Sequence, residues 1–393
     1  MNSKQQINFL KKLIQCKSVT PESEKPIDLI IKKLLDAGFI CKKLVFDDGN
    51  GNKIANLYAY YGTGEKNLCF SGHVDTVPAG DLKSWRTPPF EGIIKDEKIF
   101  GRGAVDMKGG LTSCIAAALE YIQTNSNKKS FNLSFLISGD EEWGSTGGII
   151  KLLKWLKKNN HEIEACLITE PTSQKKIGDT IKNGSRGSML FDLTVKGMQG
   201  HVAYHKHAHN PITMLVNILH DLKNLKLDSG TEFFESSNLE ITNLKVNNKA
   251  ENVIPAQAQA KFCIRFNDKH SKESLSKLVH SIIKKYTDSY SLLETLSGGA
   301  YIVNNKSFIE VIQQSIKEIL NLEPIVSTGG ATSDARFIKD FCPVIEFGPL
   351  VDTAHKKNEH IALEDLFNLT KIYRKIIENF FVVTKNAAIP NLS

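Results

Sequence analysis

The chain has 393 residues, more than one hydrophobic core usually spans, so a single small module is excluded. Hydrophobic residues make up 41% of it and charged residues 24%, which excludes disorder and coiled coil as the dominant state. The net charge of +7 comes from lysines scattered through stretches such as residues 151–158. We interpret this charge as solvated surface and expect no nucleic-acid binding.

The termini and cysteines indicate the compartment. Residues 1–15 have the spacing of an amphipathic helix rather than the apolar core of a signal peptide. No apolar run reaches the roughly 18 residues that span a bilayer. The seven cysteines form no Cys-x-x-Cys pair, and several stand in apolar runs, which favours reduced core thiols. We therefore expect a cytoplasmic protein with no membrane partner.

The first part of the chain alternates short apolar strands with helices. Strands are predicted over residues 67–71, 131–138 and 165–169, and helices over residues 108–123 and 147–158. This alternation is typical of an α/β sandwich with a largely parallel sheet.

The pattern changes after residue 183. The next elements follow the order β-α-β-β-α-β of a ferredoxin-like unit, which can stand as its own domain. They are predicted over residues 188–196, 211–225, 239–246, 256–266, 271–286 and 291–296.

The first pattern resumes after Gly298 and Gly299. A helix is predicted over residues 308–320, a strand over 344–347 and a helix over 363–380. We therefore predict one domain in two parts with a smaller domain inserted into it. The two parts are residues 1–182 and 298–393, and the insertion is residues 183–297.

Histidines and carboxylates recur where apolar strands end. His73 and Asp75 follow the strand at 67–71, and residues two apart in an extended chain face the same side. The Asp75 carboxylate can therefore fix the tautomer of the His73 ring, although a capped loop is the simpler interpretation of this pair alone. Glu170 and His355 also follow predicted strands.

Two further segments carry candidate carboxylates. Asp106 stands in the glycine-rich segment 101–110, which favours a backbone shaped to aim one side chain over a simple helix cap. Glu141 and Glu142 follow the strand at 131–138, where adjacent carboxylates repel each other unless a cation or donors compensate. For their neighbour Asp140, we expect a solvated acidic turn.

The carboxyl ends of parallel strands lie at one edge of a sheet, where α/β proteins place ligands. A nitrogen and oxygen donor set without thiolate suits Zn²⁺, with Co²⁺ or Mn²⁺ as alternatives. There are more carboxylates than one ion needs, which predicts a two-metal site with ions about 3.5 to 4 Å apart.

Several segments make the chain resemble the zinc metallopeptidase family of acetylornithine deacetylases, carboxypeptidase G2-type enzymes and succinyl-diaminopimelate desuccinylases. They occur in order over nearly the whole chain and are SGHVDTVPAG, GRGAVDMKGG, SGDEE, TEPT, GHVAY, TSDARF and the closing His355. The resemblance implies an α/β/α sandwich zinc-hydrolase catalytic domain with an inserted ferredoxin-like α+β domain that dimerises and acts as a lid.

The resemblance also implies a ligand set for two zinc ions per subunit, with Co²⁺ as an alternative. Asp106 would bridge the two ions. His73 and Glu170 would complete one site, and Glu142 and His355 the other.

Catalytic roles follow from the same resemblance. Asp75 would orient His73, and Glu141 would be the general base that takes a proton from the attacking water. His201 would reach the active site of the partner subunit in a homodimer and stabilise the oxyanion, whereas His205, His207 and His209 are interpreted as a surface cluster. The Asp106–Met107 peptide is expected to be cis.

The desuccinylases are the members that the chain resembles most, through WRTPPFEG and TEFFESSNLEIT. The resemblance implies cleavage of N-succinyl-LL-2,6-diaminopimelate to succinate and LL-2,6-diaminopimelate, for lysine and peptidoglycan precursors. Acetylornithine deacetylase, or another N-acyl-amino-acid deacylase, is the alternative. A non-catalytic binding member would lack a ligand or the base, and neither is missing.

A small N-acyl amino acid with several carboxylates needs cationic and amide donors. The positions that match this role in the desuccinylases are Lys182, Arg186, Ser188, Tyr204, Asn252, Arg265 and Thr332. Ser185, Glu251 and Val351 depart from the usual pattern, which leaves the acyl group and amine open.

Overall fold

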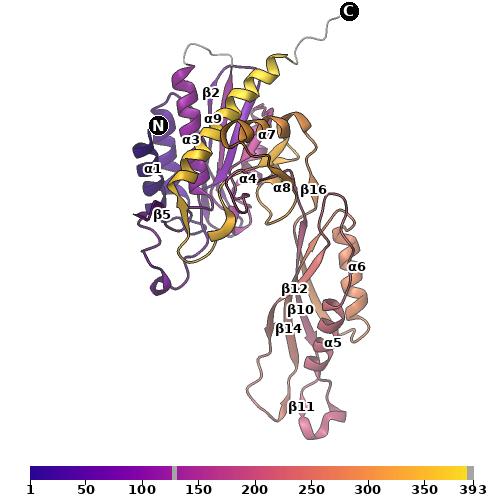
Figure 1. The fold of residues 1–393 in the computed structure, drawn as a ribbon. Coiled ribbons are helices and arrows are strands. Elements are labelled where there is room, and N and C mark those ends of the chain that lie inside the picture. Colours follow the sequence, from indigo (N-terminus) through magenta and orange to yellow (C-terminus); the bar gives the residue numbers. More distant parts are fainter. Residues whose placement is uncertain (126–130, 387–393) are drawn as a thin grey trace, which may run out of the picture. The chain divides into compact units, whose positions relative to one another are not determined.

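The computed structural model describes residues 1–125 and 131–386, and the chain divides into two compact units (Figure 1). The larger unit consists of Met1–Asn183, Val303–Ser327 and the residues from Ser333 onward. The smaller unit consists of Gly184–Ile302 and Thr328–Thr332.

The boundaries of the smaller unit differ from the predicted 183–297 for a physical reason. Strand β16 (Tyr301–Ile302) pairs with β9 (Gly184–Ser185) and so closes the unit after residue 297. The segment Thr328–Thr332 also joins it. The Thr328 hydroxyl donates to the Phe233 carbonyl, and Arg265 Nη2 donates to the Gly330 carbonyl at 2.8 Å.

Within the described residues, an eight-stranded sheet in the order β1-β2-β6-β3-β7-β18-β8-β17 forms the centre of the larger unit. Strands β6, β3, β7 and β18 are parallel neighbours. The sheet is mixed rather than largely parallel, because an antiparallel hairpin of β1 and β2 extends one edge and β8 runs antiparallel to β18. The strands are β1 (Ile40–Asp47), β2 (Lys53–Gly62), β3 (Asn67–His73), β6 (Asn132–Ser138), β7 (Ala165–Ile168), β8 (Thr180–Lys182), β17 (Ile325–Ser327) and β18 (Val344–Glu346).

Helices cover both faces of this sheet, so the predicted α/β/α sandwich is confirmed. Successive strand residues face opposite sides. Leu57 of β2 accordingly joins the apolar cluster of α1, α2, α3, α7 and α9, whereas the Tyr58 ring lies 6.0 Å from the Trp155 ring of α4. The helices are α1 (Ser3–Gln15), α2 (Glu24–Leu35), α3 (Lys108–Thr124), α4 (Ile149–Lys158), α7 (Lys306–Leu320), α8 (Ala335–Ile338) and α9 (Leu363–Asn386).

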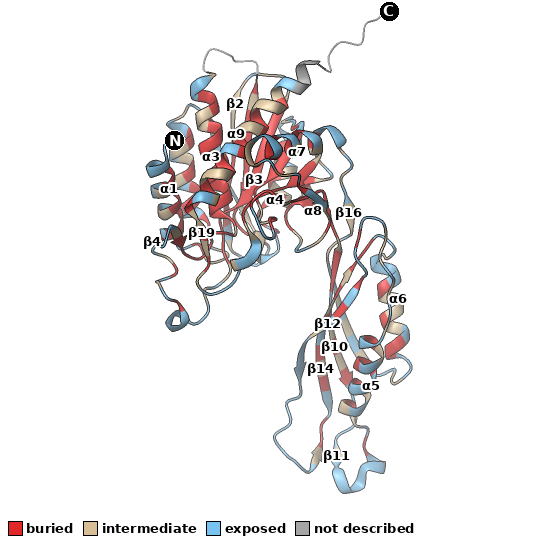
Figure 2. Ribbon diagram, in the orientation of Figure 1, coloured by how far each residue is buried: buried red, intermediate tan, exposed pale blue. Residues whose placement is uncertain are grey.

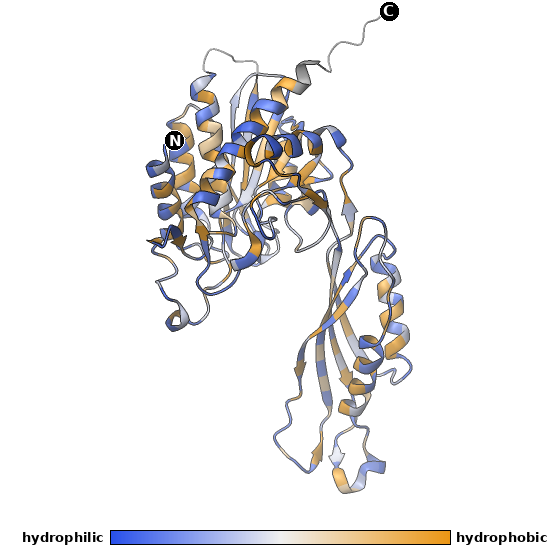
Figure 3. Ribbon diagram, viewed as in Figure 1, coloured by the Kyte–Doolittle hydropathy of each residue, from blue (hydrophilic) through white to orange (hydrophobic). Residues whose placement is uncertain are grey.

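The smaller unit has the predicted ferredoxin-like topology. Its antiparallel sheet has the order β12-β14-β10-β15, and α5 and α6 pack on one face through a separate apolar core (Figure 2). Both helices have a hydrophobic and a hydrophilic side (Figure 3). The elements are β10 (Gly187–Lys196), α5 (Pro211–Lys223), β12 (Asn238–Lys245), β14 (Gln257–Phe266), α6 (Lys272–Ile283) and β15 (Tyr290–Gly298), with a separate pair of short strands, β11 (Gly200–His201) and β13 (Val253–Ile254).

A small antiparallel sheet in the larger unit joins distant parts of the chain. It consists of β4 (Ile93–Lys95), β5 (Lys98–Phe100) and β19 (His360–Ala362) in the order β19-β5-β4. This sheet places the segment that leads to Asp106 beside the segment that follows His355.

The cysteines and the helices bear on the expected compartment. All seven cysteines lie within the described ranges and are free, and Cys16, Cys41 and Cys263 are only partly buried. In residues 1–125 and 131–386, helices long and apolar enough to cross a membrane do not occur.

Candidate metal centre

The predicted ligands lie where the parallel strands of the larger unit end. Strand β3 ends at His73, which is opposite Ser138 at the end of β6. Glu142 follows β6 in a short 3-10 turn, Glu141–Trp143, and Glu170 follows β7. The shared edge of the parallel strands therefore brings these three side chains together.

Asp106 lies between the two histidines. Its Oδ1 is 3.1 Å from His73 Nε2, and its Oδ2 is 3.0 Å from His355 Nε2. Glu170 Oε1 is 3.6 Å from His73 Nε2, and Glu142 Oε1 is 2.8 Å from His355 Nε2. The Asp106 carboxylate thus lies between two pairs of predicted ligands, His73 with Glu170 and His355 with Glu142.

The local backbone explains how Asp106 is aimed. Its side chain does not cap α3, whose N-cap is Met107, so the capping alternative does not hold. The Asp106–Met107 peptide is cis, as expected. Gly103 has a φ of +83° and an added Cβ would lie 2.7 Å from the Thr76 side chain, so this turn requires glycine.

Asp75 holds both His73 and the acidic turn. Its Oδ1 lies 3.5 Å from His73 Nδ1, and the Asp75 carbonyl is 3.0 Å from the same nitrogen. Its two carboxylate oxygens accept the backbone N–H groups of Glu141 and Glu142, each at 3.1 Å. The fully buried Asp75 therefore fixes the position of Glu141 as well as the orientation of the ring.

The charges of the cluster are strongly interdependent. Burial alone would lower the pKa of His73, but hydrogen bonds to Asp106 and Asp75 raise it well above its usual value. Hydrogen bonds to Asp106 and Glu142 raise the pKa of His355 to about 10. Burial, and then the neighbouring Asp106 carboxylate, raise the pKa of Glu170 well above its usual range.

This donor set fits divalent metal ions. Ligand atoms of His73, Asp106 and Glu142 lie within 4.8 Å of one another, as do those of His73, Glu141 and Glu170. Imidazole nitrogen and carboxylate oxygen are donors that Zn²⁺ accepts. Partly buried carboxylates packed this closely repel one another unless cations compensate.

One interpretation of the acidic turn is wrong. Asp140 is fully buried rather than solvated, and its Oδ2 accepts the Gly147 N–H at 2.7 Å. Burial raises the pKa of Asp140 to about 7. The turn back into α4 needs a buried acceptor at this position, which the sequence pattern did not indicate.

The predicted substrate-binding residues divide between the two units. In the larger unit, Lys182 is buried, and its Nζ lies 3.0 Å from Glu346 Oε2. In the smaller unit, Arg186 Nη1 donates to the Ser236 carbonyl at 2.9 Å, and Arg186 Nη2 lies 3.6 Å from Glu235 Oε2. These two cations therefore already have acidic or carbonyl partners within their own units.

The other predicted residues of the smaller unit are mostly accessible. Tyr204 is 67% exposed, and His201 and Asn252 are also exposed. Ser188 is buried, with its Oγ 3.6 Å from Cys263 Sγ. Arg265 and Thr332 are partly buried.

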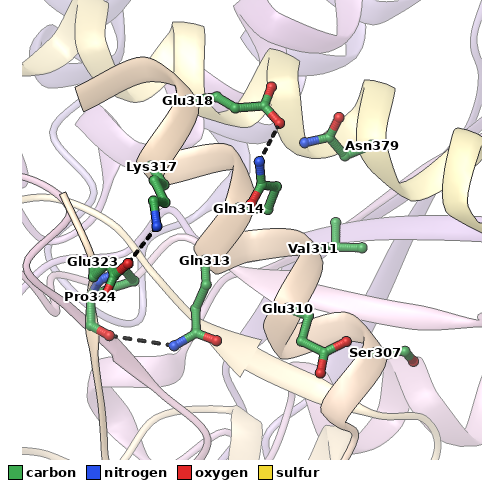
Figure 4. A pocket seen from close by; sticks show the side chains of 10 residues that line it. All are labelled: Ser307, Glu310, Val311, Gln313, Gln314, Lys317, Glu318, Glu323, Pro324 and Asn379. Carbon is green, nitrogen blue, oxygen red and sulfur yellow. Dashed lines mark hydrogen bonds and ion pairs between the residues drawn. The ribbon is translucent and has the colours of Figure 1, made fainter. Parts of the chain in front are cut away.

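A pocket along α7 is not the site (Figure 4). Four of its polar side chains form two pairs: Lys317 Nζ lies 2.5 Å from Glu323 Oε1, and Gln314 donates to Glu318 at 2.8 Å. None of the predicted metal ligands lines it.

A comparison with known families decides the relationship. The sequence model of peptidase family M20/M25/M40 matches residues 69–379, well over half of the chain. The chain belongs to this family. The resemblance predicted from the motifs is therefore confirmed.

Curated relatives in the M20 family cover almost the full length. The chain is 45% identical over 372 residues to a protein named succinyl-diaminopimelate desuccinylase from Rickettsia felis, covering 93% of this chain and 97% of that one. It is 44% identical to a protein of the same name from Ehrlichia canis, covering 96% of this chain and 99% of that one.

Solved structures share the M20 fold. A tripeptidase from Staphylococcus aureus matches with a TM-score of 0.78 at 20% identity, covering 96% of this chain and 98% of that one. An M20 family metallo-carboxypeptidase from Sulfolobus solfataricus matches with a TM-score of 0.77 at 17% identity, covering 96% and 99%. A Bacillus subtilis protein described as a dinuclear metal binding peptidase from the M20 family matches with a TM-score of 0.68 at 14% identity, covering 97% and 99%.

The M20 motif TSDARF contains a residue whose role the sequence analysis did not assign. Asp334 is buried and accepts hydrogen bonds from Ser138 Oγ at 2.8 Å and Ser145 Oγ at 2.7 Å. These serines flank the turn that carries Glu141 and Glu142. Asp334 thus joins this turn to α8, a contact between segments far apart in the sequence that spacing alone does not reveal.

Proposed function

We propose that the chain hydrolyses N-succinyl-LL-2,6-diaminopimelate to succinate and LL-2,6-diaminopimelate, a step toward lysine and peptidoglycan precursors, in the cytoplasm. The observation that carries this proposal is the single cluster in which Asp106 contacts both His73 and His355. The names of the full-length relatives support the substrate, and favour it over the acetylornithine alternative.

Two Zn²⁺ ions per subunit complete the proposed centre, with Co²⁺ as a substitute. Asp106 would hold both ions, His73 and Glu170 one of them, and Glu142 and His355 the other. Bound zinc polarises a carbonyl and makes water a nucleophile at neutral pH. The M20 relative described as dinuclear supports the number of ions.

Glu141 serves as the general base in this proposal. Its carboxylate takes the proton of the attacking water and delivers it to the leaving amine. In the protein without metal, burial raises the pKa of Glu141 well above its usual range. The Asp75 carboxylate keeps Glu141 in place through its backbone N–H.

His201 stabilises the oxyanion from the partner subunit of a homodimer. Its Nδ1 accepts the Ala203 N–H at 3.1 Å, so a neutral ring carries its proton on Nε2 and can donate it outward. The sheet face opposite α5 and α6 exposes Leu190 by 46% and Leu293 by 67%, which supports association through the smaller unit.

The proposed donors to the substrate carboxylates are Lys182, Arg186, Ser188, Tyr204, Asn252, Arg265 and Thr332. Arg186 holds Ser236 and Glu235, so it acts partly by positioning the loop that follows residue 228. Tyr204 is exposed, so its hydroxyl is accessible to a substrate without rearrangement of packed side chains.

A substrate panel tests the proposal. The zinc-loaded protein is assayed with N-succinyl-LL-2,6-diaminopimelate, N-acetylornithine and other N-succinyl and N-acetyl amino acids, and the substrates are ranked by kcat/KM. The succinylated diaminopimelate should rank first. A preference for N-acetylornithine would replace this function with that of a deacetylase, and no turnover of any amide would indicate a binding protein.

A further inference from the structure

The Glu359 side chain is fully buried beside the segment that carries Asp106. Its Oε2 accepts hydrogen bonds from Arg102 Nη1 at 2.6 Å and from the Gly103 N–H at 3.0 Å. Its Oε1 accepts the Val105 N–H at 2.8 Å and the Asp106 N–H at 3.1 Å. The Glu359 carboxylate therefore binds backbone N–H groups along this loop, from Gly103 to Asp106, the residue proposed to bridge the metal ions.

The same residue belongs to the segment that carries His355. The Glu359 carbonyl accepts the Gly101 N–H at 2.9 Å, and the next residue pairs with Phe100 where β19 meets β5. Arg102 Nη2 also lies 3.4 Å from the His355 carbonyl. Glu359 and Arg102 thus tie the two loops together just beyond the end of a short strand pair.

The charge of Glu359 is matched within the protein. Arg102 is 3% exposed, and its guanidinium lies 5.3 Å from the centre of the Trp85 ring. A buried carboxylate is tolerated when it is paired and its oxygens are hydrogen-bonded, and both conditions hold here. Removing the carboxylate would leave Arg102 Nη1 and the three loop N–H groups without the acceptor that they share.

We propose that Glu359 is a positioning residue that sets Asp106 against His355, so that the Asp106 carboxylate would be placed to hold the metal ions. Asp75 positions His73 and the turn with Glu141, and Glu359 would play the corresponding role for Asp106 and the loop with His355. This inference rests on the proposed metal-dependent hydrolysis, but it concerns metal retention and can be tested without substrate.

The test compares Glu359→Gln with a matched control, Asp228→Asn. Each oxygen of Glu359 accepts from two donors, but a glutamine amide has one oxygen and one NH₂ group. In Glu359→Gln, two of the four donors would therefore face the NH₂ group, which cannot accept their hydrogen bonds. The Asp228 side chain is only 5% exposed and also accepts backbone N–H groups, from Gly230 at 2.6 Å and Ser237 at 3.2 Å, but it lies in the smaller unit. The control therefore reports the general cost of losing such a carboxylate.

Glu359→Gln should release zinc to a chelator about 10-fold faster than the unmodified chain, or more, and shift the visible spectrum of the Co²⁺-loaded protein. Its kcat should fall by about the same factor with little change in KM. Asp228→Asn should lower the melting temperature without changing zinc release or the Co²⁺ spectrum. Zinc release and a Co²⁺ spectrum equal to those of the unmodified chain, or matched by Asp228→Asn, would overturn the proposal.

Glu359→Asp covers the case in which Glu359→Gln fails to fold. It keeps the charge for Arg102 but is too short to reach both pairs of donors, so its zinc release should be faster than that of the unmodified chain. Release equal to that of the unmodified chain would reject the positioning role. If metal retention responds as expected but succinylated diaminopimelate is not hydrolysed, only the proposed substrate fails.

Discussion

The two units hold their predicted functional residues in different ways. In the larger unit, His73 and Asp75 are buried, and Asp106 is held among them by side-chain contacts. In the smaller unit, His201 and Tyr204 are exposed, and their rings lie 5.7 Å apart with few other partners. A metal centre needs fixed geometry, which the buried contacts of the larger unit provide for the proposed ligands, whereas the exposed residues proposed for substrate recognition in the smaller unit are less constrained.

Metal removal should have the largest effect on activity, and it should act on the larger unit alone, because that unit holds all the proposed ligands. Chelated protein should lose essentially all hydrolysis and regain it with Zn²⁺ or Co²⁺. The melting temperature should also fall, because ions at about 100 times their dissociation constant stabilise a protein by about 2.7 kcal/mol. Activity that survives complete chelation, verified by elemental analysis, would contradict a metal-dependent function.

Glu141→Gln should reduce kcat by about 10² to 10⁴-fold, because it removes the proposed proton acceptor and leaves the proposed ligands in place. The measurement is steady-state hydrolysis with the zinc content determined in parallel. Glu364→Gln, at an exposed position of the larger unit, is the control and should leave kcat unchanged. Full activity in Glu141→Gln would end this mechanism.

The smaller unit is tested by His201→Ala, which should lower kcat by about 10² to 10³-fold through loss of an oxyanion donor. His205→Ala is a closely matched control, since His205 is an exposed histidine in the 3-10 segment that His201 caps, and it should have no effect. Mixing His201→Ala with Glu141→Gln should restore part of the activity if each site uses the partner's histidine. Equal kinetics for the two histidine variants would remove His201 from the mechanism.

Asp75→Asn should have the smallest effect, about 10 to 100-fold in activity or zinc affinity, because it weakens the orientation of His73 but keeps most of the shape. The readouts are zinc competition with a chelator and kcat. Asp48→Asn changes another buried aspartate that accepts backbone N–H groups in the larger unit, and it should alter stability alone. If the two variants have the same zinc affinity, Asp75 has no special role.

Local sequence patterns predicted most elements but not their arrangement. The strands ending near His73, Glu142 and Glu170 have strong apolar runs, and the structure has them within a few residues of the predicted bounds. The hairpin of β1 and β2 carries no comparable signal of its place at the sheet edge, so the sheet was expected to be more parallel than it is. The acidic run predicts a solvated turn at Asp140, which is wrong because this carboxylate is buried and accepts the Gly147 N–H.

The sequence by itself determined the secondary structure and the chemical nature of the donor set, since side-chain periodicity and residue type are local properties. It also indicated the family, because the motifs stand in order along the chain. Only the tertiary structure decided how closely Asp106 contacts His73 and His355, that Asp75 holds the acidic turn, and that Glu359 ties two loops together. These contacts join residues far apart in the chain, and they arise from strand order and from the pairing of β5 with β19, which local periodicity does not encode.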